Sequence, residues 1–312
     1  DAHRLTSPGT RPGATAGSRP AASHARHADR TRVADRRSPD RHSSPPGPAT
    51  PGTYTGPMAV LHAAGAPLTT SGYTLLIADD PTQVAAAQRL RHEVFATELG
   101  ATLRPDAEGR DVDPFDPHCD HLIVRQESTG AVVGTYRLLP PGRTDRRYAD
   151  TEFDLAALAP LRDALVEAGR SCVHPDHRTG AVITLMWAGI TRYLHLRGSR
   201  WLGGCASVPV GDGGRAVAQV WARAQARHLA PPPLRVRPRR PWFAEAPAGV
   251  TPPVDGKGEL VPPLLRGYLR LGAWICGEPA YDPDFGVADF YVLLSLDRMN
   301  PRYLRHFLGE QR

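Results

Sequence analysis

Residues 167–190 constrain the fold of this chain more than any other segment. They begin as a short strand, turn at Pro175 and Gly180, and continue directly into the apolar start of a helix. A strand that enters a helix in this way predicts an α/β fold, and the unpaired N–H groups at the start of the helix can hold an anionic or polar ligand. Arg170 lies within the strand and Glu167 three residues before it. This junction is therefore the first candidate for a functional site.

Residues 1–57 differ sharply in composition from the rest of the chain. They contain almost no large apolar side chains, so they cannot bury enough surface to offset the entropy cost of ordering. We expect a disordered tail rich in Arg, Pro and Ser, followed by one folded domain over residues 58–312. Because the chain begins with Asp1 and its first methionine is Met58, we also expect much of the tail to be dispensable or to lie upstream of the true start.

Charge and hydropathy restrict the class of protein. Nine Arg against four Asp give the tail +5 of the formal net charge of +6, so the remainder is nearly neutral. Such an arm can contact nucleic acid or anionic lipid, but a solvated extension is the simpler interpretation, and we do not expect nucleic acid as a partner. No run approaches the roughly 18 apolar residues of a membrane span, and the first residues lack the apolar core of a signal peptide. We therefore expect a cytoplasmic protein.

Hydrophobic periodicity predicts strands and helices that alternate through the folded part. The predicted strands are 73–78, 121–126, 131–139, 169–173, 201–207, one near 234–236, 272–276 and 287–296. The predicted helices are 81–99, 153–168, 180–196, about 213–228 and 264–271. We expect a polar loop at 101–117, turns at 127–130 and 277–286, and a long loop within 231–263 around the strand near 234–236. This order predicts a mixed α/β domain of roughly 240 residues with a single core.

Several motifs that suggest metal or phosphate chemistry can be set aside. Residues 118–121 read His-Cys-Asp-His, but they enter a strand and so point to alternating faces. Residues 284–286 match the magnesium motif of protein kinases without the other kinase segments, and residues 211–214 lack the Lys of a phosphate loop. The four cysteines are widely spaced, which disfavours both disulfides and a zinc site. We expect no metal site.

Polar side chains remain beside the apolar strands and helices after these exclusions. An Arg inside an otherwise buried strand must be paired, and nearby acidic residues are its natural partners. A buried ion network that only orders the sheet is one interpretation, but taken together the residues point to a functional site. The set comprises Arg91, Phe95, Asp113, Asp116, Arg137, Glu167, Arg170, Arg178 and Gly180.

A series of short motifs follows the same residues in a specific order. The first motifs are Arg89-x-Arg91-x-x-Val-Phe95-x-x-Glu98, Asp113-Pro-Phe-Asp116 with Cys119-Asp-His121, and Val133-Gly-Thr-Tyr-Arg137-Leu-Leu139. They continue with Glu167-x-x-Arg170-Ser-Cys-Val-His-Pro175, Gly204-Cys-Ala-Ser207 and Pro262-Pro-Leu-Leu-Arg-Gly-Tyr-Leu-Arg-Leu-Gly-Ala273. The last is Cys276-Gly-Glu-Pro-Ala-x-Asp-Pro-Asp-Phe-Gly286, followed by Asp289-Phe290. The series covers essentially all of residues 73–296. It resembles the GNAT-fold acyltransferases, and among them the N-acyltransferases of ornithine lipid synthesis, which are related to acyl-homoserine lactone synthases.

The resemblance implies a GNAT fold, in which helices flank a mixed central sheet, and a direct attack of an amine on an acyl thioester. The implied reaction moves a long-chain (3-hydroxy)acyl group from acyl carrier protein to an amino acid such as ornithine, forming a lyso-ornithine-type lipid. The donor is then acyl-phosphopantetheine on the carrier protein, with no bound cofactor. The loop Arg178-Thr-Gly180 departs from the usual phosphate loop of CoA-dependent members, which favours the carrier protein, although acyl-CoA stays an alternative.

The resemblance also implies roles for individual residues. Glu167 is the expected general base and Glu98 the second candidate. Backbone N–H groups near Cys172 and Val173 would stabilise the oxyanion. Arg137 and Arg170 would organise Asp113, Asp116 and Glu167, or bind the carboxylate of the acceptor. The remaining residues expected to bind substrate are Arg91, Phe95, Arg178 and Gly180, the last two as a seat for the pantetheine phosphate.

Partners and rival functions follow from the same comparison. An acidic carrier protein could dock on the Arg residues at positions 223, 227, 235, 237, 239 and 240, although a solvated helix end and loop explains them equally well. An acylated product makes transient contact with the inner membrane face reasonable. The rival enzymes are an acyl-homoserine lactone synthase-like protein and an acyl- or acetyl-CoA-dependent N-acyltransferase. The rival outside catalysis is a basic protein that binds nucleic acid or membrane.

Overall fold

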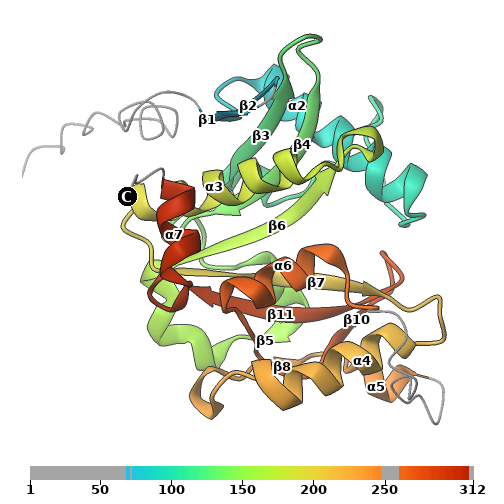
Figure 1. The fold of residues 1–312 in the computed structure, drawn as a ribbon. Helices are drawn as coiled ribbons and strands as arrows, with labels where there is room; N and C mark the ends of the chain where they lie inside the picture. The colour runs from blue at the N-terminus through green and yellow to red at the C-terminus, as the bar shows by residue number, and fades with distance from the viewer. Residues whose placement is uncertain (1–67, 71, 104, 247–259, 309–312) are drawn as a thin grey trace, which may run out of the picture. The chain divides into compact units, whose positions relative to one another are not determined.

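The computed structural model describes residues 68–70, 72–103, 105–246 and 260–308, so the predicted tail at 1–57 lies outside the described residues. One mixed sheet organises the described part (Figure 1). Its strands, in spatial order, are β1 (Leu68–Thr70), β2 (Tyr73–Ile77), β3 (Asp120–Gln126), β4 (Val132–Leu139), β6 (Leu165–Val173), β7 (Trp201–Pro209), β11 (Val287–Ser295) and β10 (Ala280–Asp282), with β9 (Trp274–Ile275) also paired to β11. A separate pair joins β5 (Phe153–Asp154) to β8 (Arg237–Pro238).

The helices follow the predicted periodicity in most places. They are α2 (Pro81–His92), α3 (Gly180–Leu196), α4 (Arg215–Arg223), α5 (Trp242–Glu245), α6 (Pro263–Leu271) and α7 (Pro301–Leu308). Two π-helical segments, Glu93–Glu98 and Ala224–His228, continue α2 and α4. The bounds of α3 agree with the prediction of 180–196 because Thr179 caps it, its hydroxyl accepting the N–H of Val182 at 3.4 Å. In the described ranges no helix combines the length and hydropathy needed to cross a bilayer.

The two faces of the sheet carry different partners. On one face, alternate residues of β6, β7 and β11 pack with α3, α4 and α6 in the main core. On the other face, α2 packs against Cys172, and the segment between β4 and β6 packs against Tyr291 and Leu293. In Figure 1, α3 and α6 lie in front of the sheet. The second face, which has the smaller clusters of apolar side chains, also carries the polar residues of the candidate site.

A β-bulge interrupts the pairing of β6 with β4. Arg137 lies opposite Gly169, whereas Thr135 lies opposite Cys172, so one extra residue of β6 is accommodated at Arg170 and Ser171. Arg170 has φ of 50°, which makes it the non-glycine residue of the described chain with left-handed backbone. The bulge brings Glu167, Gly169 and Cys172 to the same face, which strict alternation would not do.

The parallel strands β6 and β7 pair only over their first residues. Leu165, Val166 and Glu167 lie opposite Trp201, Leu202 and Gly203, and no further pairing joins these two described strands. At the last point of contact a Cβ on Gly204 would lie 2.1 Å from the carbonyl oxygen of Ala168, so only glycine permits the approach. Beyond this point the strands separate and leave an opening in the sheet.

Three predicted elements are wrong. Residues 153–168 form β5, a 3₁₀ helix at Ala156–Ala164 and the start of β6 rather than one α-helix, because Pro160 falls inside the segment and Leu165 and Val166 pair with β7. The strand near 234–236 is replaced by the 3₁₀ helix Pro232–Leu234, followed by β8. The turn at 277–286 contains β10, which forms a hairpin with β11. The predicted loop 231–263 also lies partly outside the described residues.

Candidate active site

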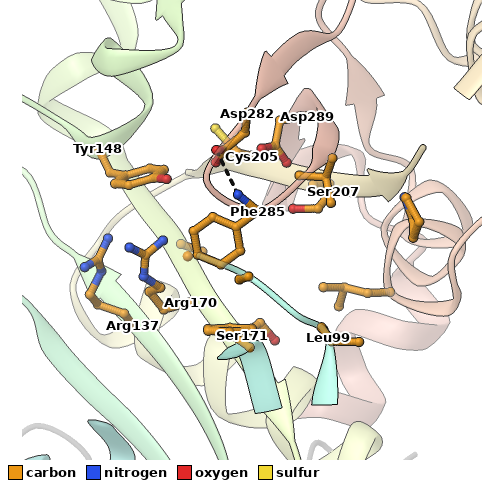
Figure 2. A pocket seen from close by; sticks show the side chains of 18 of the residues that line it. Leu99, Arg137, Tyr148, Arg170, Ser171, Cys205, Ser207, Asp282, Phe285 and Asp289 are labelled. Atoms are coloured by element: carbon orange, nitrogen blue, oxygen red, sulfur yellow. Dashed lines mark hydrogen bonds between the residues drawn. The ribbon is translucent and has the colours of Figure 1, made fainter. Parts of the chain in front are cut away.

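A cavity of about 500 Å³ occupies the opening between β6 and β7. Its apolar wall comes from the π-helical end of α2 and the loop that follows, with Phe95, Leu99 and Ala101. Its polar wall comes from the bulge of β6, from β7, and from the β10–β11 hairpin. Figure 2 shows Arg137 and Arg170 on one side and Asp282 and Asp289 on the other. The cavity therefore combines an apolar surface with charged groups of both signs.

Strand register explains why distant residues meet here. Glu167 lies opposite Leu139 on β4 and opposite Gly203 on β7. Cys205 and Ser207 follow Gly203 by two and four residues, so they lie on the same face of β7 as Gly203. Ser207 lies opposite Asp289 on β11. One face of the sheet thus gathers Glu167 of β6, Cys205 and Ser207 of β7 and Asp289 of β11.

Glu167, the expected base, is buried on the cavity wall with an exposed fraction of 5 %. Its two carboxylate oxygens accept the N–H groups of Tyr148 at 2.8 Å and Ala149 at 2.9 Å. These bonds fix the start of the 3₁₀ helix Tyr148–Thr151 against β6. Burial raises the pKa of Glu167, and the two N–H groups oppose the rise. The carboxylate keeps further lone pairs for a proton.

Three arginines and three aspartates form a buried cluster beside Glu167, called the balanced cluster below. The guanidinium of Arg91 is fully buried and binds Asp111 through Nε at 2.8 Å and Asp116 through both terminal nitrogens at 3.0 and 2.8 Å. The balanced cluster as a whole has as many positive as negative charges. The cluster consists of Arg91, Arg137, Arg170, Asp111, Asp113 and Asp116.

The other two arginines extend the balanced cluster toward the cavity. Arg137 Nη1 lies 2.8 Å from Asp113 Oδ1 and 3.1 Å from Asp116 Oδ1. Arg170 Nη2 lies 3.0 Å from Asp113 Oδ2, and its Nε lies 3.3 Å from Asp111 Oδ2. Both guanidinium groups are therefore paired with aspartates. Glu167 is not in ion-pair contact with either of them among the described residues.

Aromatic rings hold Arg170 at the cavity wall. Its guanidinium carbon lies 4.9 Å from the ring centre of Tyr148 and 5.0 Å from that of Phe285. Phe285 comes from the turn between β10 and β11, where the sequence predicted only a turn. Figure 2 shows both rings beside Arg170. The left-handed backbone of Arg170 is an unfavourable conformation for a residue other than glycine. The contacts of its side chain with the two rings and the aspartates hold it in this conformation.

Three carboxylates form a second buried cluster, the acidic cluster, across the cavity from Arg137 and Arg170. Glu152, Asp282 and Asp289 each place an oxygen within 4.8 Å of the others. Their exposed fractions are 9 %, 8 % and 3 %. Burial, and then the charges of Asp289 and Asp282, raise the pKa of Glu152 to about 9. Burial also raises the pKa of Asp289 to about 6. None of the three is among the site residues expected from the sequence.

The residues expected to bind phosphate lie at the start of α3. Arg178 makes two hydrogen bonds to Glu98, at 2.7 and 2.6 Å, and donates from Nε to the carbonyl oxygen of Val173 at 3.1 Å. This pair is partly exposed, and neither residue lines the cavity. Arg178 lowers the pKa of Glu98, which makes Glu98 a poorer base than Glu167. Gly180 begins α3.

The remaining predicted residues are divided between the two faces. Phe95 and Glu167 line the cavity, whereas Asp113 and Asp116 lie behind Arg137 and Arg170. Cys172 packs with α2, and Val173 packs in the main core on the opposite face. Sequence reasoning did not identify Asp111 or the acidic cluster. Asp282 and Asp289 were within quoted motifs, but no local pattern marked Glu152.

Comparison with known proteins places the chain in a family. The acetyltransferase (GNAT) domain family matches residues 90–188. A protein from Rhodobacter capsulatus named L-ornithine N(alpha)-acyltransferase is 37% identical over 253 residues, covering 77% of this chain and 95% of that protein. The chain belongs to the L-ornithine N(alpha)-acyltransferase family. A protein of the same name from Brucella abortus is 31% identical over 252 residues, covering 75% of this acyltransferase and 88% of its own length.

Solved structures give a more distant likeness. A CoA-dependent acyl-homoserine lactone synthase, BjaI, aligns with a TM-score of 0.44 and 18% identity, covering 74% of this acyltransferase and 85% of that chain. The family, the GNAT fold with its mixed sheet, and the enzyme class expected from the motifs are confirmed by the family match and the curated relatives.

Proposed function

We propose that this acyltransferase moves a long-chain (3-hydroxy)acyl group from the phosphopantetheine arm of acyl carrier protein to the α-amine of ornithine, giving a lyso-ornithine-type lipid. The names of the relatives support ornithine as the acceptor. The observation that carries the proposal is the position of Glu167, a buried carboxylate with a raised pKa on the wall of the cavity where β6 and β7 separate.

The chemistry needs a neutral amine and a polarised carbonyl. The amine nitrogen attacks the thioester carbon, the C–N bond forms, and the C–S bond breaks to release the pantetheine thiolate, which becomes the thiol by taking the proton that Glu167 has accepted. Glu167 accepts the proton that the attacking amine gives up, since a raised pKa brings a carboxylate nearer to neutral pH, where a general base works best. The backbone N–H groups around the bulge, from Arg170 to Val173, stabilise the oxyanion.

The balanced cluster serves as the scaffold of this arrangement. Arg91, Asp113 and Asp116 hold Arg137 and Arg170 against β4 and β6. Because the charges are mutually satisfied, these side chains position the bulge and the aromatic wall rather than binding the carboxylate of the acceptor. Domain 58–312 is the catalytic unit in this proposal.

The donor approaches along the start of α3. Arg178 and the N–H group of Gly180 bind the single phosphate of the pantetheine arm, and the apolar wall at Phe95 and Leu99 receives the acyl chain. Arginines on α4 and the segment after it offer an acidic carrier protein a docking surface at positions 223, 227, 235, 237, 239 and 240. The acylated product brings the enzyme into transient contact with the inner membrane face.

Thiol release tests the function directly. Long-chain acyl carrier protein and the matching acyl-CoA are offered with a panel of amines that includes ornithine and S-adenosylmethionine. We expect release with the carrier protein and ornithine. Release from acyl-CoA but not from the carrier protein would show that CoA is the donor. Product formation with S-adenosylmethionine but not with ornithine would show that S-adenosylmethionine is the acceptor. Absence of release with every pair would exclude the proposal.

Glu167→Gln tests the base. The amide cannot accept the proton, so we expect turnover to fall roughly 100-fold or more. Asp163→Asn, an exposed carboxylate of the 3₁₀ helix Ala156–Ala164, is the matched control and should keep full activity. Circular dichroism checks that the variant is folded, because an amide has one acceptor oxygen for the two N–H groups that the carboxylate binds. Near-normal turnover in a folded Glu167→Gln protein would remove this residue from the role.

A further inference from the structure

We infer that the acidic cluster binds the side-chain ammonium of a diamino acid acceptor, while the α-amine of the same molecule faces the thioester. The inference rests on the proposed acyl transfer to an amino acid. It goes further by assigning the group that selects the acceptor and decides which of its two amines reacts. The carboxylates concerned are Glu152, Asp282 and Asp289.

The acidic cluster is open to the substrate cavity. Asp282 and Asp289 line it, together with Glu167, and Figure 2 shows both aspartates on the wall formed by the β10–β11 hairpin. Glu152 stands next to them at the end of the 3₁₀ helix Tyr148–Thr151. Strand register puts Asp289 opposite Ser207 on the face of the sheet that carries Glu167. A single small molecule in this cavity can therefore contact both groups.

Hydrogen-bonding capacity in the acidic cluster is only partly used. Both carboxylate oxygens of Glu152 and Oδ1 of Asp289 are buried without a partner in good hydrogen-bond geometry, and both side chains are about nine-tenths buried or more. Cys205 and Tyr148 lie near enough to Glu152, and Ser207 to Asp289, to oppose the rise in pKa that burial causes. One oxygen of Asp282 accepts the N–H groups of Asp284 and Phe285, at 2.9 and 3.2 Å. Among the described residues no Arg, Lys or His forms an ion pair with any of the three. Buried carboxylates with acceptor positions left open and no basic group in ion-pair contact point to a cationic ligand.

An ammonium group fits these acceptors. It carries one positive charge and three N–H donors, and three carboxylates surround the position it would occupy. The unsatisfied oxygens then gain charge-assisted hydrogen bonds. In the absence of a cation, a proton held between Glu152 and Asp289 relieves part of the repulsion, in keeping with their raised pKa values. Binding exchanges that proton for the ammonium.

The acidic cluster suits the amine that does not react. Negative charges around an amine raise its pKa and keep it protonated, which would prevent nucleophilic attack. The reacting amine must lose its proton, and Glu167, on the other part of the cavity wall, is the group placed to take it. Tyr148 lies between the two regions. Its N–H binds Glu167, and the pKa of its phenol is raised first by burial and then by the nearby charge of Glu152. The side-chain amine is also the stronger base of the two, so it is the one to be held as a cation.

The experiment compares two acceptors that differ only in the side-chain amine. Ornithine and norvaline have the same carbon chain, and norvaline lacks the δ-amine. We expect the native enzyme to prefer ornithine in kcat/KM. Asp289→Asn and Glu152→Gln should each raise the KM for ornithine about 30-fold or more, because one partner of a buried charge pair is lost. The ratio of kcat/KM values for ornithine and norvaline should fall toward one.

Controls separate this effect from misfolding and from loss of the reaction. Asp163→Asn should keep the native ratio. The two cluster variants should be at least as stable as the native protein, since each removes a charge from three like charges. Variants that retain the ornithine preference would overturn the inference. A native enzyme that acylates norvaline as well as ornithine would also overturn it, while leaving the proposed acyl transfer intact.

Two binding measurements complete the test. Should the native enzyme acylate neither amino acid, the proposed function fails, and calorimetric titration with ornithine alone then decides the inference. Ornithine binding that Asp289→Asn abolishes supports it, and no binding to the native protein refutes it. Titration with Ca²⁺ and Mn²⁺ addresses a metal site. Tight metal binding that Asp289→Asn removes would overturn the ammonium assignment.

Discussion

The two buried clusters of charge beside the cavity differ in balance. The balanced cluster pairs three arginines with three aspartates, and the acidic cluster gathers three carboxylates without a basic partner among the described residues. As a result, the pKa of a carboxyl group in the balanced cluster is lowered, whereas that of a carboxyl group in the acidic cluster is raised. Burial raises the pKa of Asp116, but Arg91 and Arg137 outweigh it and leave the pKa far below its usual value. In Glu152, burial and neighbouring carboxylates act together and raise the pKa to about 9.

The contrast indicates what each cluster contributes. A buried network whose charges cancel is complete without a ligand and can act as a rigid support. A buried group of like charges is complete only with a cation or with protons, which is a property of a binding site rather than of a scaffold. The same cavity therefore has a preorganised side at Arg170 and a ligand-dependent side at Asp289.

Breaking the balanced cluster should have the largest effect. Arg91→Met leaves Asp111 and Asp116 buried with fewer partners, and we expect the free energy of unfolding to fall by about 3–5 kcal/mol. Urea denaturation measures it. Arg89→Met, at an exposed position of α2, is the control and should change stability by less than about 0.5 kcal/mol. Equal losses in the two variants would contradict the scaffold role.

The acidic cluster should respond to pH in the opposite direction. A carboxyl group whose pKa is higher in the folded state binds more protons there, so stability falls as pH rises between the two pKa values. For Glu152, faced by Asp282, Asp289, Cys205 and Tyr148, that window runs from its ordinary pKa of 4.5 to about 9. We expect the free energy of unfolding of the native protein to fall across this window, by at most about 6 kcal/mol, and Glu152→Gln to flatten the loss.

Measurement of that pH dependence also needs a control and a competitor. Asp163→Asn should show the native slope. Saturating ornithine should reduce the slope, because the ammonium replaces the proton in the acidic cluster. A slope that Glu152→Gln leaves unchanged would mean that other groups carry the pH dependence. The balanced cluster, through the lowered pKa of Asp116, contributes stability that is lost only as pH falls below the usual range of Asp.

The partly exposed pair of Arg178 and Glu98 should give the smallest change in stability. Solvent screens both charges, so Arg178→Ala should alter the free energy of unfolding by about 0–1 kcal/mol. The KM for the acyl donor should rise several-fold because the phosphate ligand is lost. Arg200→Ala, which removes the exposed pair with Asp297, is the matched control and should leave the KM unchanged. An unchanged KM for the acyl donor in Arg178→Ala would show that Arg178 is not part of the phosphate-binding site.

Much of the fold was accessible from local patterns. The cap at Thr179 and the apolar block after it indicate α3, and two short apolar runs joined by the turn at 127–130 indicate β3 and β4. Prediction failed at residues 153–168, where apolar residues at helical spacing occur in a 3₁₀ helix that leads into β6. Periodicity does not separate these states, because the pairing of Leu165 with Trp201 depends on residues far along the chain.

Local sequence features indicate the balanced cluster more closely than the acidic cluster. A buried Arg demands a carboxylate, so the strand and helix positions of Arg91, Arg137 and Arg170 were enough to indicate acidic partners. Nothing local brings Glu152 to Asp282 and Asp289, and no rule of pairing calls for three like charges together. Tertiary structure alone decided that meeting, through the register of β7, β10 and β11 and the segment that crosses beside them. Opposite charges attract and so indicate each other as partners, whereas like charges repel and are brought together only by the contacts of the rest of the fold.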